Sequence, residues 1–260
     1  MNNITIVISI NGDGNPKRRD FESWLLDQLP KKTKANLLVI PNLIDLRADG
    51  PSIRAIANAA DDILLLSWIF PRPAFWTLRS NGIDGRAGHS FDAKTERTIC
   101  CLQLDLDAGH EAILGQVIQL TGALRGRGSQ VSHITEVTKR RWYPVIDYDR
   151  CSNCLECLNF CLFGVFELDK ADQIKVQEPD ACRDGCPACS RVCPSSAISF
   201  PRCIEKTIAG SDETVDSTRG RGGLDILGPK ACECKLPKPR KTSDKSNVDD
   251  LIEKLDELDL

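Results

Sequence analysis

Two cysteine-rich stretches decide the fold of the middle of this chain: CSNCLECLNFC (Cys151–Cys161) and CRDGCPACSRVCP (Cys182–Pro194). The first has the spacing C-x2-C-x2-C-x3-C, and the second has C-x3-C-x2-C-x3-C-P. Three thiolates about three residues apart can wrap the chain around one face of an iron–sulfur cube. The fourth, three residues further on, starts a helix that points away and reaches another cluster. The spacing therefore predicts two metal centres that exchange one ligand each.

The flanks of the two stretches are also alike. VIDYDRC (Val145–Cys151) aligns with VQEPDAC (Val176–Cys182), with six residues from the valine to the first cysteine in both. After the fourth cysteine, FGVFEL (Phe163–Leu168) corresponds to PSSAISF (Pro194–Phe200). We therefore expect an internal duplication, in which strand, cysteine loop, helix and strand occur twice.

At residues 143–203 the chain resembles the bacterial-type ferredoxins that carry two 4Fe–4S clusters. This resemblance covers about 60 of the 260 residues. It implies an α+β ferredoxin-like domain and the following ligand sets. One cluster would be bound by Cys151, Cys154, Cys157 and Cys193, and the other by Cys182, Cys186, Cys189 and Cys161.

Two departures from the ferredoxin pattern matter. Leu162 stands where proline usually follows the fourth cysteine of such a motif, and one extra residue separates Cys182 from Cys186. Proline is not a ligand, so we expect its loss to change local rigidity and potential rather than cluster content. The insertion keeps the number of ligands and changes the local geometry of the second cluster.

Two other kinds of metal site use similar cysteines. Structural zinc needs only four thiolates, usually from two separated pairs, and eight thiolates in two crossed quartets have no comparable zinc arrangement. The spacing Cys182-x3-Cys186-x2-Cys189 also matches radical S-adenosylmethionine enzymes. However, a fourth cysteine and Pro194 follow it, and too little chain remains for the barrel of those enzymes. Two 4Fe–4S clusters are the preferred interpretation.

Residues 1–140 have a different pattern, in which short apolar runs alternate with amphipathic segments. The expected strands are Ile4–Ile10, Asn36–Pro41, Asp62–Ile69 and Thr98–Leu106, with a weaker one near Gln130–Val137. The expected helices are Phe21–Leu29, capped by Asp20, then Ser52–Ala60, Pro73–Arg79 and Gly109–Leu124. Near-continuous apolar strands between helices predict a doubly wound parallel sheet, and hence a Rossmann-like or flavodoxin-like α/β domain.

The turn after the first expected strand has two interpretations. Asn11-Gly12-Asp13-Gly14 precedes a helix, which is where α/β domains bind phosphates. The full G-x-G-x-x-G is absent, because Lys17 stands at the last glycine position. Gly12 and Gly14 either hold a flavin or nucleotide, or form a plain strand-to-helix turn.

The segment after the third expected strand could belong to an interface. Phe75, Trp76 and Arg79 follow that strand, at the sheet edge where ligands and partners bind. They suit an interface and a core equally well.

Five cysteines lie outside the two motifs. Cys100 and Cys101 are neighbours in an expected strand and face opposite sides of the sheet, which favours core packing over a shared metal. Cys203, Cys232 and Cys234 would form a third metal centre one ligand short, or are free thiols in a tail.

Composition and charge limit the classes of partner and the cellular compartment that we expect. The net charge of −3 gives no indication of a nucleic-acid or anionic-membrane partner. The longest apolar run, Ile63–Phe70, is too short to span a membrane, and the start shows no signal peptide. Thirteen cysteines in a chain of this kind indicate metal in a reducing compartment, so we expect a cytoplasmic protein.

The charges of the two folded parts are opposite. Residues 1–142 have eighteen basic and fifteen acidic side chains, whereas residues 143–204 have six and nine. We expect three segments: the α/β domain at 1–140, the ferredoxin domain at 141–204, and a largely disordered tail at 205–260. The tail ends in Asn247–Leu260, where apolar residues fall on one helical face and could dock on a partner.

These features favour an electron-transfer protein, or the iron–sulfur subunit of a larger oxidoreductase. Its partner would be a redox protein or the other subunits of such a complex. No nucleophile–base pair or carboxylate dyad is evident in the sequence. The alternative is an enzyme whose α/β domain binds a flavin or nucleotide and exchanges electrons with the clusters. A redox-sensing or assembly protein is a third interpretation, without any nucleic-acid feature in its favour.

Overall fold

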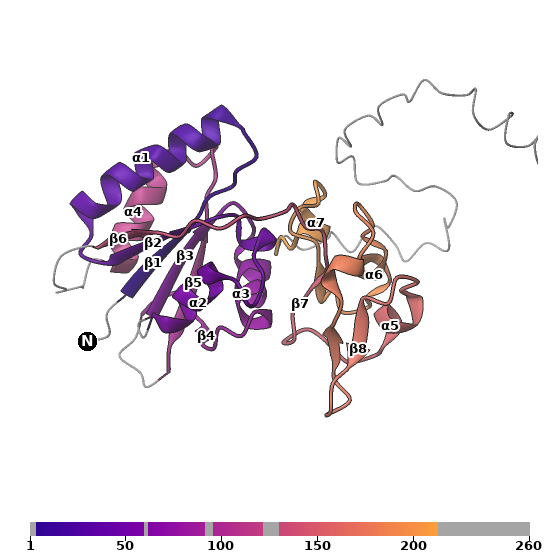
Figure 1. The fold of residues 1–260 in the computed structure, drawn as a ribbon. Coiled ribbons are helices and arrows are strands. Elements are labelled where there is room, and N and C mark those ends of the chain that lie inside the picture. Colours follow the sequence, from indigo (N-terminus) through magenta and orange to yellow (C-terminus); the bar gives the residue numbers. More distant parts are fainter. Residues whose placement is uncertain (1–3, 60–61, 92–95, 122–129, 213–260) are drawn as a thin grey trace, which may run out of the picture.

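The computed structural model describes residues 4–59, 62–91, 96–121 and 130–212. Figure 1 shows an α/β part, coloured from indigo to magenta, beside a smaller part in orange that contains the two cysteine motifs. Most of the predicted tail and its terminal helix at Asn247–Leu260 lie outside the described residues. Within the described ranges, no helix combines the length and the apolar character needed to cross a membrane.

One parallel sheet organises the α/β part. Its strands are β1 (Ile4–Ser9), β2 (Asn36–Ile40), β3 (Asp62–Ser67), β4 (Arg86–Ala87), β5 (Thr98–Gln103) and β6 (Val131–His133). They lie in the order β4-β5-β3-β1-β2-β6, and every pair is parallel. Because β2 and β3 flank β1, the chain winds outward in both directions from β1. The predicted parallel α/β sheet is confirmed, and only the two-residue β4, too short to carry a periodic signal, was missed.

The helices cover both faces of this sheet. They are α1 (Pro16–Lys32), α2 (Pro51–Asn58), α3 (Pro71–Ser80) and α4 (His110–Thr121), and the short η1 (Leu43–Asp45) follows β2. Figure 1 shows α1 and α4 on one face and α2 and α3 on the other. Phe21 and Val117 belong to the core on the first face, and Ile56 and Leu78 to the core on the second.

Helix α1 begins five residues before the predicted start. Its N-cap is Asn15, whose side chain accepts a hydrogen bond from the Lys17 amide, and Pro16 follows at the first helical position. The prediction of Asp20 as the cap was therefore wrong. After Pro16 the first turn carries only charged side chains, so the apolar period begins later than the helix does.

The cysteine-rich part contains two copies of one structural unit. The first copy contains β7 (Val145–Ile146), α5 (Glu156–Phe160) and β8 (Phe166–Leu168). The second contains β9 (Ile174–Val176), η2 (Pro179–Ala181), α6 (Ala188–Val192) and β10 (Ile198–Ser199), and α7 (Lys206–Ala209) follows it. Strand β7 pairs with β10 and β8 with β9, both antiparallel. The expected order of strand, cysteine loop, helix and strand is present in both copies.

Equivalent positions of the two copies have equivalent backbone geometry. The Asp147 amide donates to the Ala197 carbonyl at 2.8 Å, and the aligned Glu178 amide donates to the Val165 carbonyl at 3.1 Å. Each copy thus donates a hydrogen bond into the other. Figure 1 shows α5 of the first copy beside α6 of the second.

The two parts of the chain contact each other through a mixed interface. Ile44 of η1 packs with Tyr143 and Val145 in one small buried cluster. Trp76 of α3 makes an edge contact with Tyr148, with ring centroids 5.4 Å apart. Phe75, by contrast, lies in the core of the α/β part. Of the two aromatic residues after β3, Phe75 therefore belongs to the core, and Trp76 lies at an interface within the chain.

Candidate metal centres

Four cysteines line one small cavity in the cysteine-rich part. They are the four that the ferredoxin resemblance assigns to the first cluster: Cys151, Cys154, Cys157 and Cys193. Ile146, Ile174 and Ile198 line the same cavity, so its surroundings are largely apolar. The buried Cys157 thiol has Cys151 and Cys193 as electrostatic neighbours. We call these four residues the first cysteine group.

The other four motif cysteines form a second cysteine group. It consists of Cys161, Cys182, Cys186 and Cys189. The Cys182 thiol interacts with those of Cys186 and Cys161, so the last cysteine of the first motif lies with the second motif. The buried Cys189 interacts with the rest of its group and also with Cys157. The two groups are therefore adjacent, with Cys157 and Cys189 between them.

Burial affects the acidity of several motif cysteines. Burial raises the pKa of Cys157 to about 11 and that of Cys182 to about 12, and it also raises the pKa of Cys189. Neighbouring thiolates raise these pKa values further through charge repulsion. Several anionic thiolates so close together in an apolar region are unfavourable unless iron neutralises them. This soft, all-sulfur donor set fits iron–sulfur clusters, which accept and release single electrons.

Left-handed backbone shapes the first cysteine loop. Asn153 and Leu155 have φ angles of 54° and 64°. The Asn153 side chain accepts a hydrogen bond from the Ile174 amide at 2.9 Å and donates to the Asp172 carbonyl at 2.8 Å. This side chain therefore fastens the first loop to the hairpin of β8 and β9.

The loop end near Cys193 is also fixed by the backbone. The Ala197 amide donates to the Cys193 sulfur at 3.3 Å. Ser196, just before it, has a φ of 50°, and the aligned Gly164 has a φ of 67°. Hydrogen bonds of this kind orient a thiolate ligand and influence the potential of its cluster.

The two departures from the ferredoxin pattern have simple structural outcomes. The extra residue before Cys186 is accommodated by a turn, closed by the Cys186 amide and the Arg183 carbonyl at 3.1 Å. Gly185 has a φ of 76° in this turn, a conformation that glycine adopts without strain. Leu162, in the usual proline position, is 91% exposed and contributes nothing to the core.

The cysteines outside the motifs fall into two sets. Cys100 belongs to the core on one face of the sheet, while Cys101 packs against the core on the other, as predicted. Cys203 is buried in the core of the cysteine-rich part rather than lying in a tail. Cys232 and Cys234 lie outside the described residues. Among those described, no three histidine, cysteine or acidic side chains are arranged around a single metal ion.

The glycines after β1 lie in an exposed turn whose polar groups bond to one another. Gly12 and Gly14 have φ angles of 65° and 76°. Asp13 accepts from the Asn15 amide at 2.9 Å and pairs with Arg18 at 2.7 Å. Together with the Asn15 cap, these oxygens occupy amides at the start of α1 that a phosphate would use. These hydrogen bonds are those of a strand-to-helix turn.

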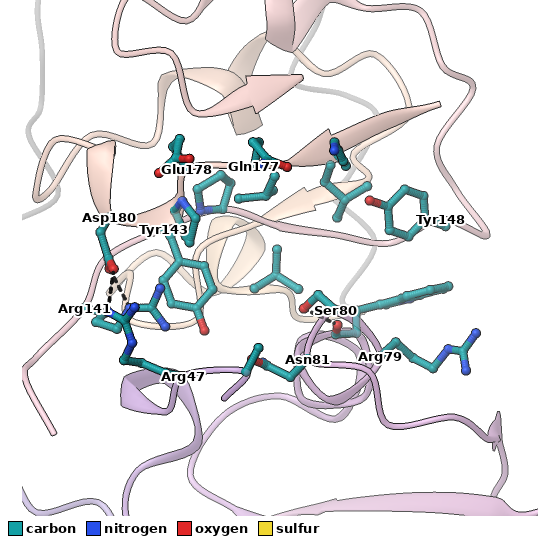
Figure 2. Close-up of a pocket in the computed structure, with 18 of the residues that line it drawn as sticks. Arg47, Arg79, Ser80, Asn81, Arg141, Tyr143, Tyr148, Gln177, Glu178 and Asp180 are labelled. Atoms are coloured by element: carbon teal, nitrogen blue, oxygen red, sulfur yellow. Dashed lines mark hydrogen bonds and ion pairs between the residues drawn. The ribbon is translucent and has the colours of Figure 1, made fainter. Parts of the chain in front are cut away.

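A cleft between the two parts was not predicted. It has a volume of about 640 Å³, and Figure 2 shows Arg47 and Asn81 of the α/β part facing Asp180 and Gln177 across it. Arg141 stacks over the Tyr143 ring at 4.7 Å and pairs with Asp180 at 2.6 Å. The opposite net charges of the two parts were the only sequence signal for this contact.

A buried ion pair near the first cysteine group was also missed. Arg72 Nη1 of α3 lies 3.4 Å from Asp147 Oδ2, and the two side chains are only 11% and 5% exposed. The alignment of Asp147 with Glu178 in the duplicated flanks could have identified an acidic position before each cysteine loop. Its arginine partner, 75 residues earlier in the chain, could not be identified in that way.

The comparisons with known proteins match about a quarter of the chain. Over 61 residues the chain is 44% identical to an uncharacterized ferredoxin of Methanocaldococcus jannaschii, covering 23% of this chain and 41% of that protein. It is 43% identical over 56 residues to a ferredoxin of Methanothermococcus thermolithotrophicus, covering 21% of this chain and 90% of that one. A pyruvate synthase subunit PorD of M. jannaschii is 34% identical over 65 residues, which are 25% of this chain and 73% of the subunit. No family model matches the chain.

The fold, the two cysteine groups and these similarities define an iron–sulfur electron-transfer protein or subunit. Through its cysteine-rich part, the chain belongs to the ferredoxins. The α/β part is unassigned.

Proposed function

We propose that this chain binds two 4Fe–4S clusters and acts as a low-potential one-electron carrier. The observation that carries the proposal is the crossed arrangement of eight cysteines into two adjacent groups. The first group would bind one cluster and the second group the other. Each cluster would hold one electron at a time, and the low end of the range known for such clusters suits the ferredoxin similarity.

The contact between the groups supports electron transfer inside the chain. Cys157 and Cys189 are both buried, and their thiols interact. Helices α5 and α6, which carry these two cysteines, pack side by side. Two clusters bound there would lie close together, so an electron could pass between them without leaving the protein. Cys154 is exposed, which brings the first cluster near the surface.

We further propose that the chain serves a larger oxidoreductase. The similarity to pyruvate synthase PorD subunits from two methanogens supports this role. A cytoplasmic location fits as well, because none of the eleven described cysteines forms a disulfide, as is usual in reducing compartments.

Anaerobic purification with iron and sulfide analysis tests the clusters. We expect about eight iron and eight sulfide per chain from two four-iron clusters. A zinc-only protein, or one four-iron cluster with the remaining motif cysteines reduced, would contradict the proposal. An additional flavin band in the absorption spectrum would instead support the enzyme alternative.

A further inference from the structure

The buried ion pair joins the α/β part to the first cysteine loop. Arg72 is the second residue of α3, and Asp147 directly follows β7. Both side chains are almost completely buried. Outside this pair, Arg72 also lies 3.3 Å from the exposed Asp212, and the same Asp147 oxygen lies 3.4 Å from Nε of the more exposed Arg150.

Asp147 contacts both ends of the first cysteine group through the backbone. Its carbonyl accepts a hydrogen bond from the Cys151 amide at 3.0 Å. Its own amide donates to the Ala197 carbonyl at 2.8 Å, and the Ala197 amide in turn donates to the Cys193 sulfur at 3.3 Å. The Asp147 carboxylate also accepts from the Asp149 amide at 3.0 Å, which closes the turn before Cys151. Asp147 is therefore a fixed negative charge beside two proposed ligands of one cluster.

The second cysteine loop lacks such a buried pair. Glu178 occupies the position equivalent to Asp147, and its amide makes the equivalent hydrogen bond to Val165. The Glu178 side chain is exposed, and it forms no ion pair within the described residues. The acids of this loop that are paired, Asp180 and Asp184, lie at the surface. Within the ranges that the structure describes, only the first loop has a buried arginine from the α/β part.

We propose that Arg72 is a positioning residue through which the α/β part sets the reduction potential of the first cluster. This inference rests on the proposed function, because it requires that cluster. A negative charge nearby opposes the uptake of an electron, and the effect is strong where water is excluded. The buried Arg72 guanidinium compensates the Asp147 carboxylate together with the more exposed Arg150, so the first cluster is reduced more easily than it would be beside an aspartate paired with Arg150 alone.

The experiment is an anaerobic redox titration of both clusters, followed by electron paramagnetic resonance. A chemical reductant supplies one electron to each cluster, and no bond is formed or broken. In Arg72→Gln we expect the equilibrium constant for reducing one cluster to fall about tenfold, which is about 59 mV for a one-electron couple. The other cluster should change much less and serves as an internal reference.

Three further variants separate charge from packing. Arg72→Lys keeps the positive charge and should stay near the parent potential. The double variant Arg72→Gln with Asp147→Asn removes both charges, so it should return most of the way to the parent. Arg202→Gln is the matched control, because it breaks the ion pair with Asp45 between the same two parts, on the side of the second cysteine loop. It should leave the potential of the first cluster unchanged.

The outcomes are decisive in each case. If Arg72→Gln keeps about eight iron and its two potentials equal the parent's, the inference is wrong while the proposed function stands. If Arg72→Gln loses the first cluster, the double variant decides: recovery of the cluster supports the charge argument, and continued loss shows a packing role only. A parent protein without clusters would overturn the proposed function itself.

Discussion

The two cysteine loops are copies in sequence and differ in their surroundings. Asp147, before the first loop, pairs with Arg72 inside the interface. Before and within the second loop, Asp180 pairs with Arg141 at 2.6 Å and Asp184 with Arg140 at 3.0 Å, both near solvent. The duplication explains why both loops can bind the same kind of cluster. The α/β part makes the two copies unequal, because it buries a charge pair at one of them.

The difference between the buried and the exposed ion pairs suggests what the α/β part does for the cysteine-rich part. Its residues up to 142 carry an excess of positive charge, and the cysteine-rich part carries an excess of negative charge. Ion pairs between the two parts, such as Arg72 with Asp147, bring these opposite charges together. We infer that the α/β part acts on the clusters through contact and charge.

The largest expected effect comes from removing a ligand. Cys157→Ala should cost one complete cluster, about four iron and four sulfide, because Cys157 is buried in the first cysteine group. Cys100→Ala is the matched control, since Cys100 is equally buried but lies in the sheet core. It should keep all of the iron. Equal iron loss in both variants would show that the cysteines have been sorted incorrectly.

Separating the two parts should have the next largest effect. Both core clusters of the α/β part contain only residues before 135, so a 1–140 fragment keeps its own core. We expect cooperative thermal unfolding of this fragment without iron. Its melting temperature should be lower than that of the α/β part in the full chain, because Ile44, Asp45 and Arg72 lose their partners. A fragment that is insoluble, or that unfolds without cooperativity, would place the domain boundary elsewhere.

The ion pairs allow a direct comparison of the two loops. Arg72→Met leaves the buried Asp147 carboxylate with Arg150 as its remaining arginine partner, so it should cost more than about 1 kcal/mol but less than the roughly 3–5 kcal/mol of a fully uncompensated buried charge. Arg140→Met breaks an exposed pair with Asp184 and should cost less than about 1 kcal/mol. Urea unfolding of the two variants measures this difference. Similar costs would mean that burial does not distinguish the loops.

Much of this architecture follows from local sequence signals. Alternating apolar runs predicted the parallel sheet, and the similar flanks of the two cysteine motifs predicted the repeated unit. The two cysteine groups were implied by the ferredoxin resemblance. The start of α1 was misplaced because its first turn is charged, and β4 was missed because it has only two residues. Arg72 and Asp147 could not be paired from sequence, since no local period links residues so distant along the chain. Contacts of this kind depend on how two finished parts pack together.

The smallest expected effect concerns Tyr143, which lies in the interface and is 6% exposed. Within the described part of the chain its hydroxyl has no hydrogen-bond partner. Burying such a hydroxyl is unfavourable, so Tyr143→Phe should be neutral or stabilising by about 1 kcal/mol at neutral pH. Urea unfolding of the parent and the variant at pH 8 measures this difference.

The pH dependence of the same substitution gives a sharper test. Burial raises the pKa of Tyr143 from 10.0 to about 12, with the nearby Arg141 opposing this shift. A raised pKa in the folded state means that the associated stability is present below pH 10 and is lost as the pH rises from about 10 to about 12. The parent should therefore lose more stability than Tyr143→Phe over this range, by up to about 2 kcal/mol. Tyr148→Phe is the control, because Tyr148 is less buried and its substitution should leave most of the alkaline loss in place. If the parent and Tyr143→Phe lose stability equally above pH 10, the Tyr143 hydroxyl is in contact with water and the interface is looser than described.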